Sequence, residues 1–238
     1  LHSGLLNLNI KNYFFGFIFS FLIKKIDFLF FGSYSSKNWW QKYYPWIKIK
    51  NKKVLFNGIK IQNNQKIRTL KRKINISFIG RLEKENNPKF FIKIANLIGQ
   101  NSKHIIFNIF GDGPLSSELK SISNSKNILF YGWKDKRFIF KKTDIVIITS
   151  KINNFPYVAL ESKAYGIPVV SCSKGDIKKI VKNKVDGYIK YTDSEEEMFN
   201  LIKKVIKEYK FLSKNALKRV NEFEINKSCK NFWKVIDV

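Results

Sequence analysis

The strongest constraint on the fold is the alternation, from residue 74 onward, of short apolar runs with longer amphipathic stretches. The apolar runs predict strands at 74–80, 104–111, 127–132, 144–150, 168–172 and 187–191. The stretches between them have helical periodicity and predict helices at 88–99, 114–123, 134–142, 156–166 and 176–183. Strands that are apolar throughout and separated by helices are typical of a parallel sheet covered on both faces. The sequence therefore predicts a doubly wound α/β domain.

The domain organisation follows from where this alternation begins. Residues 74–238 are predicted to form the complete α/β domain together with C-terminal helices. Residues 61–73, where the apolar periodicity lapses, are predicted to be a linker. Residues 1–60 have α/β character but are too few for a second complete domain, so they are interpreted as a truncated part of one.

Individual elements are also predicted near the two ends of the chain. The N-terminal part is expected to contain strands at 27–31 and 54–58, with an aromatic-rich helix at 36–44 between them. In the C-terminal part, Asp193 and Glu196 are spaced as a helix cap and its partner, ahead of a helical pattern at 198–209.

The charge of the chain has two interpretations. Lys and Arg number 45 against 18 Asp and Glu, which gives a formal net charge of +27. Such a surface attracts phosphates, nucleic acid or an anionic membrane. The lysines are scattered, however, and Lys, Asn, Ile and Phe are abundant together, as expected from AT-rich coding DNA. A functional basic face and a compositional bias both remain open.

The cellular compartment is predicted from the cysteines and the apolar segments. Cys172 and Cys229 form no C-x-x-C motif, so neither a disulfide framework nor a zinc site is expected, which fits a reducing cytosol. No signal peptide is visible, although the chain opens on Leu1 rather than Met. The apolar stretch at 13–23 is shorter than the roughly 20 residues of a spanning helix. It is interpreted as a core helix, and an interfacial role is left open.

Ligands of doubly wound sheets bind at the carboxyl ends of the strands, so the residues there are the first candidates for a site. The first predicted strand ends in Gly80 and Arg81, whose guanidinium can donate two hydrogen bonds to phosphate oxygens. The second ends in a turn with Gly111 and Gly113, which let the backbone approach a ligand closely. Ser116 stands where the third glycine of the dinucleotide fingerprint belongs, so NAD binding is rejected.

A helix is predicted to begin at Pro156, after the fourth strand. Proline suits the first turn of a helix because it has no N–H group to leave unpaired. The backbone N–H groups of Tyr157, Val158 and Ala159 would then lack partners at the positive end of the helix, where an anion can bind.

Glu161 lies just behind this helix start. Helical side chains lean toward the N-terminus, so its carboxylate would extend back toward the anion site and accept hydrogen bonds from a ribose diol. The alternative is a solvated surface glutamate. The same spacing predicts that Tyr157 and Leu160 face the sheet.

Seven segments carry a resemblance to a known family. They are GRL (80–82), FGDGP (110–114), FYGW (130–133), DIVIITS (144–150), NNFPYVALESKAYGIPVVS (153–171), KGD (174–176) and DGYI (186–189). In order and spacing they resemble the C-terminal half of glycosyltransferase family 4, whose members are retaining enzymes of the GT-B fold. The resemblance implies one complete Rossmann-like domain that binds a nucleotide-diphosphate sugar, and part of a second, acceptor-side domain at 1–60.

The resemblance also implies roles for individual residues. Arg81 would contact the diphosphate, Glu161 the ribose, and His2 the donor sugar, although a loop histidine without a role is an open alternative. Tyr131 and Gly132 would line the base. The other implied donor-binding positions are Gly80, Asn86, Gly111, Gly113, Ser150, Phe155, Pro156, Tyr157, Val158 and Ala159.

Two positions depart from the family pattern. Asn153 stands where the family usually has a glutamate, and Asn86 where it usually has a lysine, with Lys84 or Lys89 as candidates to replace that charge. No metal is expected, because Arg81 and the helix end can stabilise a leaving diphosphate. No other cofactor is expected either.

Three hypotheses about function follow. The leading one is a retaining hexosyltransferase that transfers a sugar from a UDP- or GDP-sugar to a glycan or lipid-linked acceptor, in polysaccharide or lipopolysaccharide biosynthesis. It would be cytoplasmic, with an optional peripheral contact to anionic membrane. The second is a non-catalytic or truncated homologue that retains nucleotide binding. The third, a basic nucleic-acid-binding protein, is disfavoured because no nucleic-acid motif is present.

Overall fold

The computed structural model describes residues 26–61, 66–99 and 102–236. His2 and the apolar stretch at 13–23 lie outside these residues. The chain divides into two compact units, Leu1–Gly58 with Asn226–Val238, and Ile59–Ile225. The predicted boundaries differ from this division in two main respects. Residues 61–73, predicted to be a linker, fall within the larger unit, and 226–238, predicted to belong to the C-terminal domain, fall within the smaller one.

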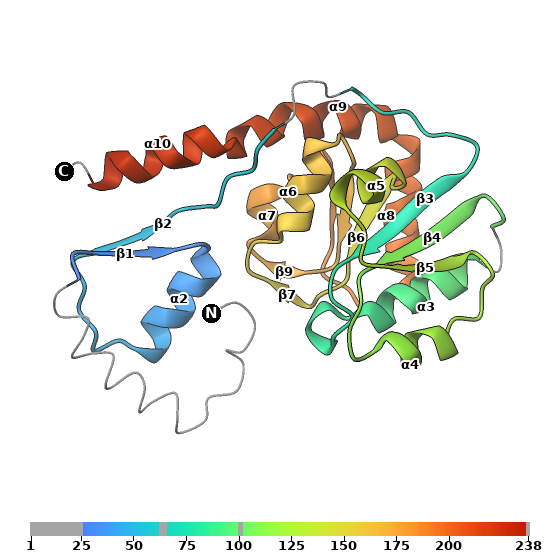
Figure 1. Cartoon of the computed structure of the whole chain (residues 1–238), viewed down its shortest axis with the longest axis horizontal. Helices are drawn as coiled ribbons and strands as arrows, with labels where there is room; N and C mark the ends of the chain where they lie inside the picture. The colour runs from blue at the N-terminus through green and yellow to red at the C-terminus, as the bar shows by residue number, and fades with distance from the viewer. Residues whose placement is uncertain (1–25, 62–65, 100–101, 237–238) are drawn as a thin grey trace. The chain divides into compact units, whose positions relative to one another are not determined.

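The larger unit is built on a six-stranded parallel sheet with the order β10-β8-β6-β3-β4-β5 (Figure 1). Its strands are β3 (Ile74–Ile79), β4 (Ile105–Phe110), β5 (Ile128–Gly132), β6 (Ile145–Ile148), β8 (Val169–Ser171) and β10 (Gly187–Ile189). The chain proceeds from β3 to one edge, then returns to β6 and proceeds to the other edge. This is the order of a doubly wound sheet, with its switch point between β3 and β6.

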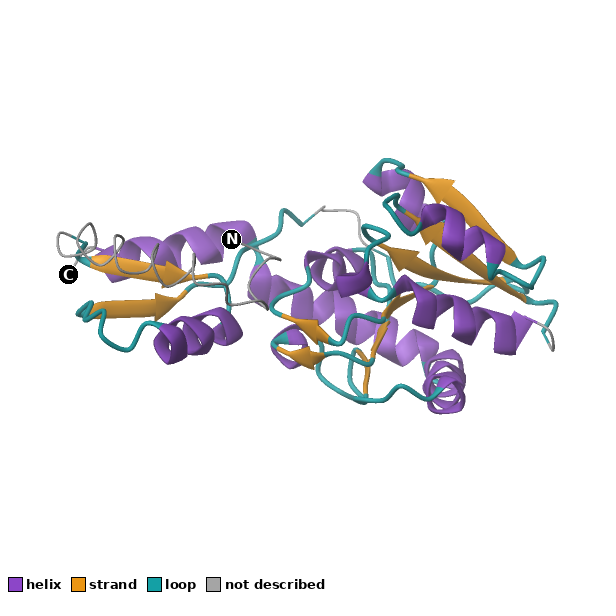
Figure 2. Ribbon diagram, turned by 90° about the horizontal axis from the view of Figure 1, so that it is seen from below, coloured by secondary structure: helices purple, strands orange, loops and turns teal. Residues whose placement is uncertain are grey.

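Helices lie on both sides of this sheet (Figure 2). They are α3 (Pro88–Gly99), α4 (Ser116–Ser121), α5 (Lys136–Lys141), α6 (Tyr157–Ala164), α7 (Ile177–Ile180), α8 (Glu195–Lys207) and α9 (Tyr209–Val220). α3 packs on α8, and Phe91 of α3 meets Phe78 and Phe107 of the sheet at centroid distances of 5.7 and 5.9 Å. The predicted doubly wound α/β fold class, with its six strands and the helices between them, is confirmed.

The cap of α8 lies one residue later than predicted. Ser194 is the N-cap, and its hydroxyl accepts a hydrogen bond from the backbone N–H of Glu197 at 3.3 Å. Asp193 and Glu196 had the same spacing, so the three-residue interval alone could not choose between the pairs. Ser194 has the extended backbone that a cap needs.

The smaller unit contains a parallel β-α-β arrangement. Its elements are β1 (Phe28–Phe31), α2 (Tyr34–Tyr43), β2 (Asn51–Val54) and most of α10 (Ile225–Ile236). The strand predicted at 54–58 is wrong, because pairing with β1 selects the polar run that ends at Val54. Phe232 of α10 packs on Phe30, with a centroid distance of 5.2 Å. Across the parts of the chain that the structure describes, no helix has both the length and the apolarity to cross a bilayer.

Candidate functional site

The centre of the candidate site is the switch point of the larger sheet, where β3 and β6 end side by side. The Thr149 hydroxyl, just after β6, donates a hydrogen bond to the carbonyl of Asn86 at 3.0 Å. The Asn86 amide in turn donates to the carbonyl of Arg81 at 2.9 Å. The loop after β3 is therefore fixed to the end of β6.

Arg81 presents its guanidinium outward from this loop. Its side chain is 60% exposed and forms an ion pair with Glu83 at 3.1 Å. An exposed ion pair of this kind is weak, so the guanidinium remains accessible to a stronger anion such as a diphosphate.

The two lysines predicted to replace the missing charge at Asn86 differ in their partners. Lys89 pairs with Glu118 on α4. Lys84 is exposed, lies in the short 3₁₀ helix Lys84–Asn86, and has no ion pair with any described residue.

Gly111 and Gly113 have a structural role that the sequence did not indicate. Both have positive φ, and a Cβ on Gly111 would lie 1.9 Å from the carbonyl oxygen of Gly80. A Cβ on Gly113 would lie 2.7 Å from the carbonyl oxygen of Leu82. The two glycines therefore allow the loops after β3 and β4 to pack backbone to backbone, which sets the shape of the site.

Tyr131 belongs to an aromatic group at the end of β5. Its ring stacks on Phe110 at 4.9 Å, and Phe138 meets it edge-on at 6.0 Å. Lys142 donates a hydrogen bond to its hydroxyl at 2.9 Å. Gly132 follows with φ of +66° and has open space where a side chain would be. The predicted base-lining position is thus a rigid aromatic wall next to an open backbone segment.

The N-terminal end of α6 approaches the same edge of the sheet. Pro156 precedes the first helical residue, and no side chain caps the helix. Ala159 donates its N–H to the Pro156 carbonyl at 3.0 Å, so the expectation of a free group there is wrong. The backbone N–H groups of Tyr157 and Val158 have no hydrogen bond to any described residue. Phe155, just before the turn, packs on Phe223 at 6.0 Å.

Tyr157 does not face the sheet as predicted. Its side chain is 45% exposed, whereas Ala159 and Leu160 are fully buried. The reason is that the buried stripe of α6 runs through these two residues and Ala164, with Tyr157 on the flank. Partial burial, and to a lesser extent the negative charge of Glu161, raises the pKa of the Tyr157 hydroxyl.

Glu161 is neither a solvated surface residue nor a free carboxylate. It forms an ion pair through Oε1 with Lys136, at the first position of α5, and its side chain is only 18% exposed. The hydrogen bond and charge of Glu161 raise the pKa of Lys136. Oε2 is not part of this ion pair.

Asn153 lies on a short ribbon beside the end of β6. It belongs to β7 (Ile152–Asn153), which pairs in parallel with β9 (Lys174–Gly175). Its amide donates to the hydroxyl of Ser150 at 3.0 Å, and that hydroxyl lies 3.1 Å from the hydroxyl of Ser173. Gly175 has φ of +100°, and a Cβ there would lie 2.5 Å from the Asn153 carbonyl. The Asn153 amide is thus fixed by a hydroxyl pair.

A buried ion cluster that the sequence did not predict holds α6 from behind. Lys163 is fully buried and pairs with Asp186 at 2.8 Å, and it donates to the carbonyl of Ile180 at 2.6 Å. Arg219 of α9 also pairs with Asp186 at 2.8 Å. Burial lowers the pKa of Lys163, and Asp186 opposes this effect. The cluster joins α6, α7 and α9, so it fixes the position of the helix end.

The structure thus brings together, within one unit, the predicted residues of the loops after β3, β4, β5 and β6 and the start of α6. Residues missed by sequence reasoning are Thr149, Ser173, Gly175, Lys136 and the Lys163 cluster. Lys163 carried a usable signal, since a lysine on an otherwise apolar helical stripe requires a partner. Among the described residues, no group of three or more His, Cys, Asp and Glu side chains is arranged to hold a metal ion.

The fold defines a doubly wound α/β protein, and comparison with known families identifies the family. The chain belongs to the family described as glycosyl transferases group 1, whose model matches residues 60–221. This confirms the resemblance at the level of the family. The narrower assignment to family 4 stays a prediction.

Individual relatives agree with this assignment. The chain is 30% identical over 175 residues to an Escherichia coli protein named UDP-Gal:α-D-GlcNAc-diphosphoundecaprenol α-1,3-galactosyltransferase, covering 68% of this chain and 45% of the relative. It is 29% identical over 169 residues to a Campylobacter jejuni protein named GalNAc-α-(1→4)-GalNAc-α-(1→3)-diNAcBac-PP-undecaprenol α-1,4-N-acetyl-D-galactosaminyltransferase, covering 68% of this chain and 47% of the relative. The chain therefore spans less than half the length of these curated relatives.

The fold is shared with solved structures. Anabaena HepE, crystallised with UDP and glucose, superimposes with a TM-score of 0.77 at 16% identity, covering 93% of this chain and 66% of HepE. At this identity the likeness shows the fold.

Proposed function

We propose that this chain is the donor-binding part of a retaining glycosyltransferase that takes a sugar from a UDP- or GDP-sugar. The observation that carries the proposal is the meeting, at one sheet edge, of the exposed Arg81 guanidinium, the uncapped start of α6 and the carboxylate of Glu161. The guanidinium would bind one phosphate, the helix start would bind the second phosphate, and the carboxylate would bind the ribose. UDP is the preferred nucleotide, because the relative HepE was crystallised with UDP.

The chemistry follows from these positions. As the bond between sugar and diphosphate breaks, negative charge develops on the leaving diphosphate. Arg81, the N–H groups of Tyr157 and Val158, and Lys84 would stabilise that charge, so no metal ion is required. The free Oε2 of Glu161 would accept a hydrogen bond from the ribose while Oε1 keeps its pair with Lys136.

The acceptor is proposed to be a glycan or a lipid-linked glycan. Support comes from the names of both relatives, which specify acceptors on an undecaprenol carrier. Such a carrier resides in the membrane, so we also propose a peripheral position on the cytoplasmic membrane face.

A second candidate function is nucleotide binding without transfer. It is favoured by the two departures from the family pattern: Asn86 braces a loop and Asn153 holds Ser150, so neither supplies charge to a donor.

Calorimetry with UDP and with GDP in EDTA tests the proposal. We expect binding of UDP to the 238-residue chain without metal, weakened by Glu161→Ala and unchanged by Lys120→Ala on the exposed face of α4. Absence of heat with both nucleotides, at protein concentrations suited to micromolar affinity, would disprove nucleotide binding and with it both candidate functions. If the chain binds UDP, a UDP-sugar hydrolysis assay separates the two functions. Slow hydrolysis of the donor indicates a transferase, because a protein that only binds the nucleotide does not consume UDP-sugar.

A further inference from the structure

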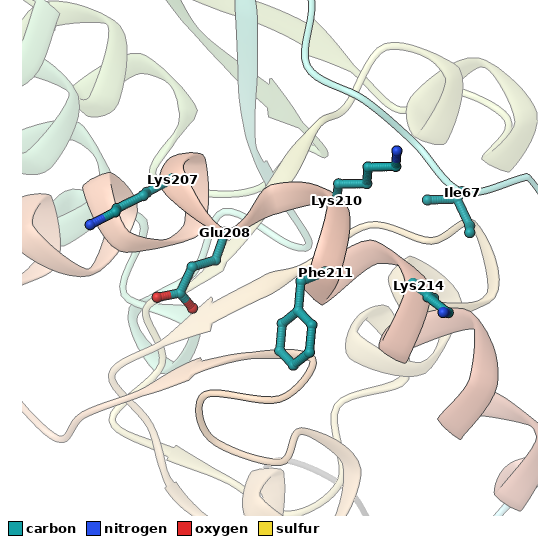
Figure 3. A pocket seen from close by; sticks show the side chains of 6 residues that line it. All are labelled: Ile67, Lys207, Glu208, Lys210, Phe211 and Lys214. Atoms are coloured by element: carbon teal, nitrogen blue, oxygen red, sulfur yellow. The ribbon is translucent and has the colours of Figure 1, made fainter.

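A second surface of the larger unit lies away from the donor site. A pocket of about 450 Å³ is lined by Ile67, Lys207, Glu208, Lys210, Phe211 and Lys214 (Figure 3). Five of these residues come from the end of α8 and the first turns of α9, and Ile67 comes from the segment that precedes β3. We call these six residues the basic pocket.

The basic pocket is at the amino ends of the strands. The hydroxyl of Tyr209, the first residue of α9, donates a hydrogen bond at 2.9 Å to the carbonyl of Asp144, the residue directly before β6. Arg68, in the segment that leads into β3, donates its backbone N–H to the hydroxyl of Ser213 on α9 at 2.9 Å. The donor site is at the carboxyl ends of the same strands. A partner bound at the basic pocket therefore leaves the donor site accessible.

The segment that carries Ile67 is fixed against α9. Besides its bond to Ser213, Arg68 donates to the carbonyl of Phe140 at 2.9 Å and pairs with Asp144 at 3.4 Å. Three anchors on one residue hold Ile67 in place. The pocket is thus part of the folded unit.

The basic pocket has three lysines against one carboxylate. Lys207, Lys210 and Lys214 are exposed, and none of them has an ion pair within the described residues. The one carboxylate of the lining, Glu208, accepts a hydrogen bond from the Tyr188 hydroxyl at 2.7 Å. The segment before β3 adds further exposed basic residues, namely Lys66, Lys71, Arg72 and Lys73.

Two large apolar side chains are exposed among these charges. Phe211 is 56% exposed and Ile67 is 46% exposed. Exposed apolar residues surrounded by lysines are the pattern of a membrane-surface element, in which the apolar groups enter the interface while the lysines reach lipid phosphates. A glycan site would instead need neutral amide or hydroxyl groups around an aromatic platform, and the lining contains none.

The directions of the lysines distinguish a surface from a single anion. Figure 3 shows their side chains fanning outward in different directions from the helical backbone. A lone phosphate is held by donors that converge on one point, whereas headgroups spread over a plane match donors that diverge.

We propose that the basic pocket is a docking surface for anionic phospholipid headgroups, with Phe211 and Ile67 inserted into the interfacial layer. The inference rests on the proposed peripheral location and adds to it the part of the chain that makes the contact. It orients the larger unit with the amino ends of its strands toward the lipid, so the glycan of a lipid-linked acceptor would have to extend from the membrane to the donor site at the carboxyl ends of the strands.

Vesicle sedimentation tests the proposal. The 238-residue chain is mixed with vesicles of phosphatidylcholine alone or with one quarter phosphatidylglycerol, at low and physiological salt. The test variant combines Lys207→Ala, Lys210→Ala and Lys214→Ala. The matched control combines Lys120→Ala, Lys126→Ala and Lys182→Ala, which remove the same charge from exposed positions elsewhere on the unit.

We expect the wild type to bind only the anionic vesicles. Because one lysine at an anionic surface contributes about fivefold to partitioning, the test variant should lose roughly a hundredfold and the control far less. Phe211→Ser should weaken binding at physiological salt as well, since the apolar contribution is not screened. UDP calorimetry and thermal unfolding of each variant should match the wild type.

Three results would overturn the proposal. Equal losses in the test variant and the control would show that only overall charge matters. Wild-type protein that ignores anionic vesicles but still binds UDP would remove the peripheral location and leave the proposed chemistry intact. Binding of a short single-stranded RNA that the test variant abolishes, without vesicle binding, would assign the surface to nucleic acid.

Discussion

Glu161 on α6 and Lys136 on α5 form an ion pair whose carboxylate is largely buried and whose ammonium is largely exposed. The pair joins the middle of α6 to the first residue of α5, beside the candidate ribose position. One oxygen of this lone glutamate, close behind a helix start in a lysine-rich chain, is held by the protein, and the other lies outside the ion pair.

The first prediction concerns this carboxylate. Glu161→Ala should weaken UDP binding by about tenfold, the loss expected for one hydrogen bond to a charged group. Calorimetry with UDP and with 2′-deoxy-UDP in both proteins isolates the ribose contact, because the deoxy ligand should lose affinity only in the wild type. Lys136→Met, which breaks the pair from its exposed side, should change UDP affinity less than Glu161→Ala. Equal discrimination of the two ligands by both proteins would argue against the contact.

The second prediction concerns the loops after β3 and β4. Gly111→Ala should lower the free energy of unfolding by roughly 2–4 kcal/mol, because its Cβ would overlap the Gly80 carbonyl at a positive φ. Gly132→Ala is the matched control: it also has positive φ but meets nothing within 4 Å, so it should cost only about 1 kcal/mol. Urea denaturation measures both. Similar losses would show that backbone strain, and not the close approach, sets the cost.

The third prediction concerns the buried ion cluster. Asp186→Asn should destabilise the chain by about 3–5 kcal/mol, because it leaves the buried Lys163 ammonium without its counter-charge. Glu222→Gln removes a 53%-exposed partner of Arg219 and should cost less than about 1 kcal/mol. Urea unfolding curves of the two variants give the comparison. A small loss in Asp186→Asn would mean that Lys163 is neutral in the folded chain.

The fourth prediction concerns the two thiols. Burial raises the pKa of Cys172 to about 11, whereas Cys229 is exposed on α10. At pH 8 a thiol reagent should therefore modify one cysteine in the folded chain and two in denaturant, because the thiolate is the reactive form. Cys229→Ser should abolish the fast reaction. Rapid modification of Cys172 in that variant would contradict the packing at the end of β8.

The fifth prediction tests whether the site is impaired. Asn86→Lys should tighten UDP binding severalfold at low salt by adding a cation near the diphosphate, at the cost of the hydrogen bond to the Arg81 carbonyl, about 1 kcal/mol of stability. Lys84→Ala in the wild type is the complement and should weaken binding. Should Asn86→Lys have no effect while Lys84→Ala does, Lys84 already supplies the charge.

The sheet was predictable because its strands are mostly apolar, so each appears in the sequence as a short, largely apolar run with a helical stretch after most of them. β2 was misplaced because the prediction relied on apolar runs. Its residues, NKKV, are mostly polar, and only pairing with β1 shows that they form a strand.

Within the site, positions at strand ends were predictable, since topology alone brings them together. Partners were not. Lys136 is twenty-five positions before Glu161, and Thr149 reaches Asn86 across sixty-three. Such pairings depend on how loops pack after the sheet has formed, and no local pattern encodes them.

The hydrogen bond from Thr149 to Asn86 also bears on when, during folding, a ligand can first bind. It links the two halves of the sheet across the switch point, so neither half alone contains the site. Pairing so distant in sequence forms late, because closing a long loop costs entropy before any contact repays it. UDP should therefore slow unfolding without accelerating refolding, and the lifetime of the folded chain, rather than its rate of formation, would track the supply of nucleotide.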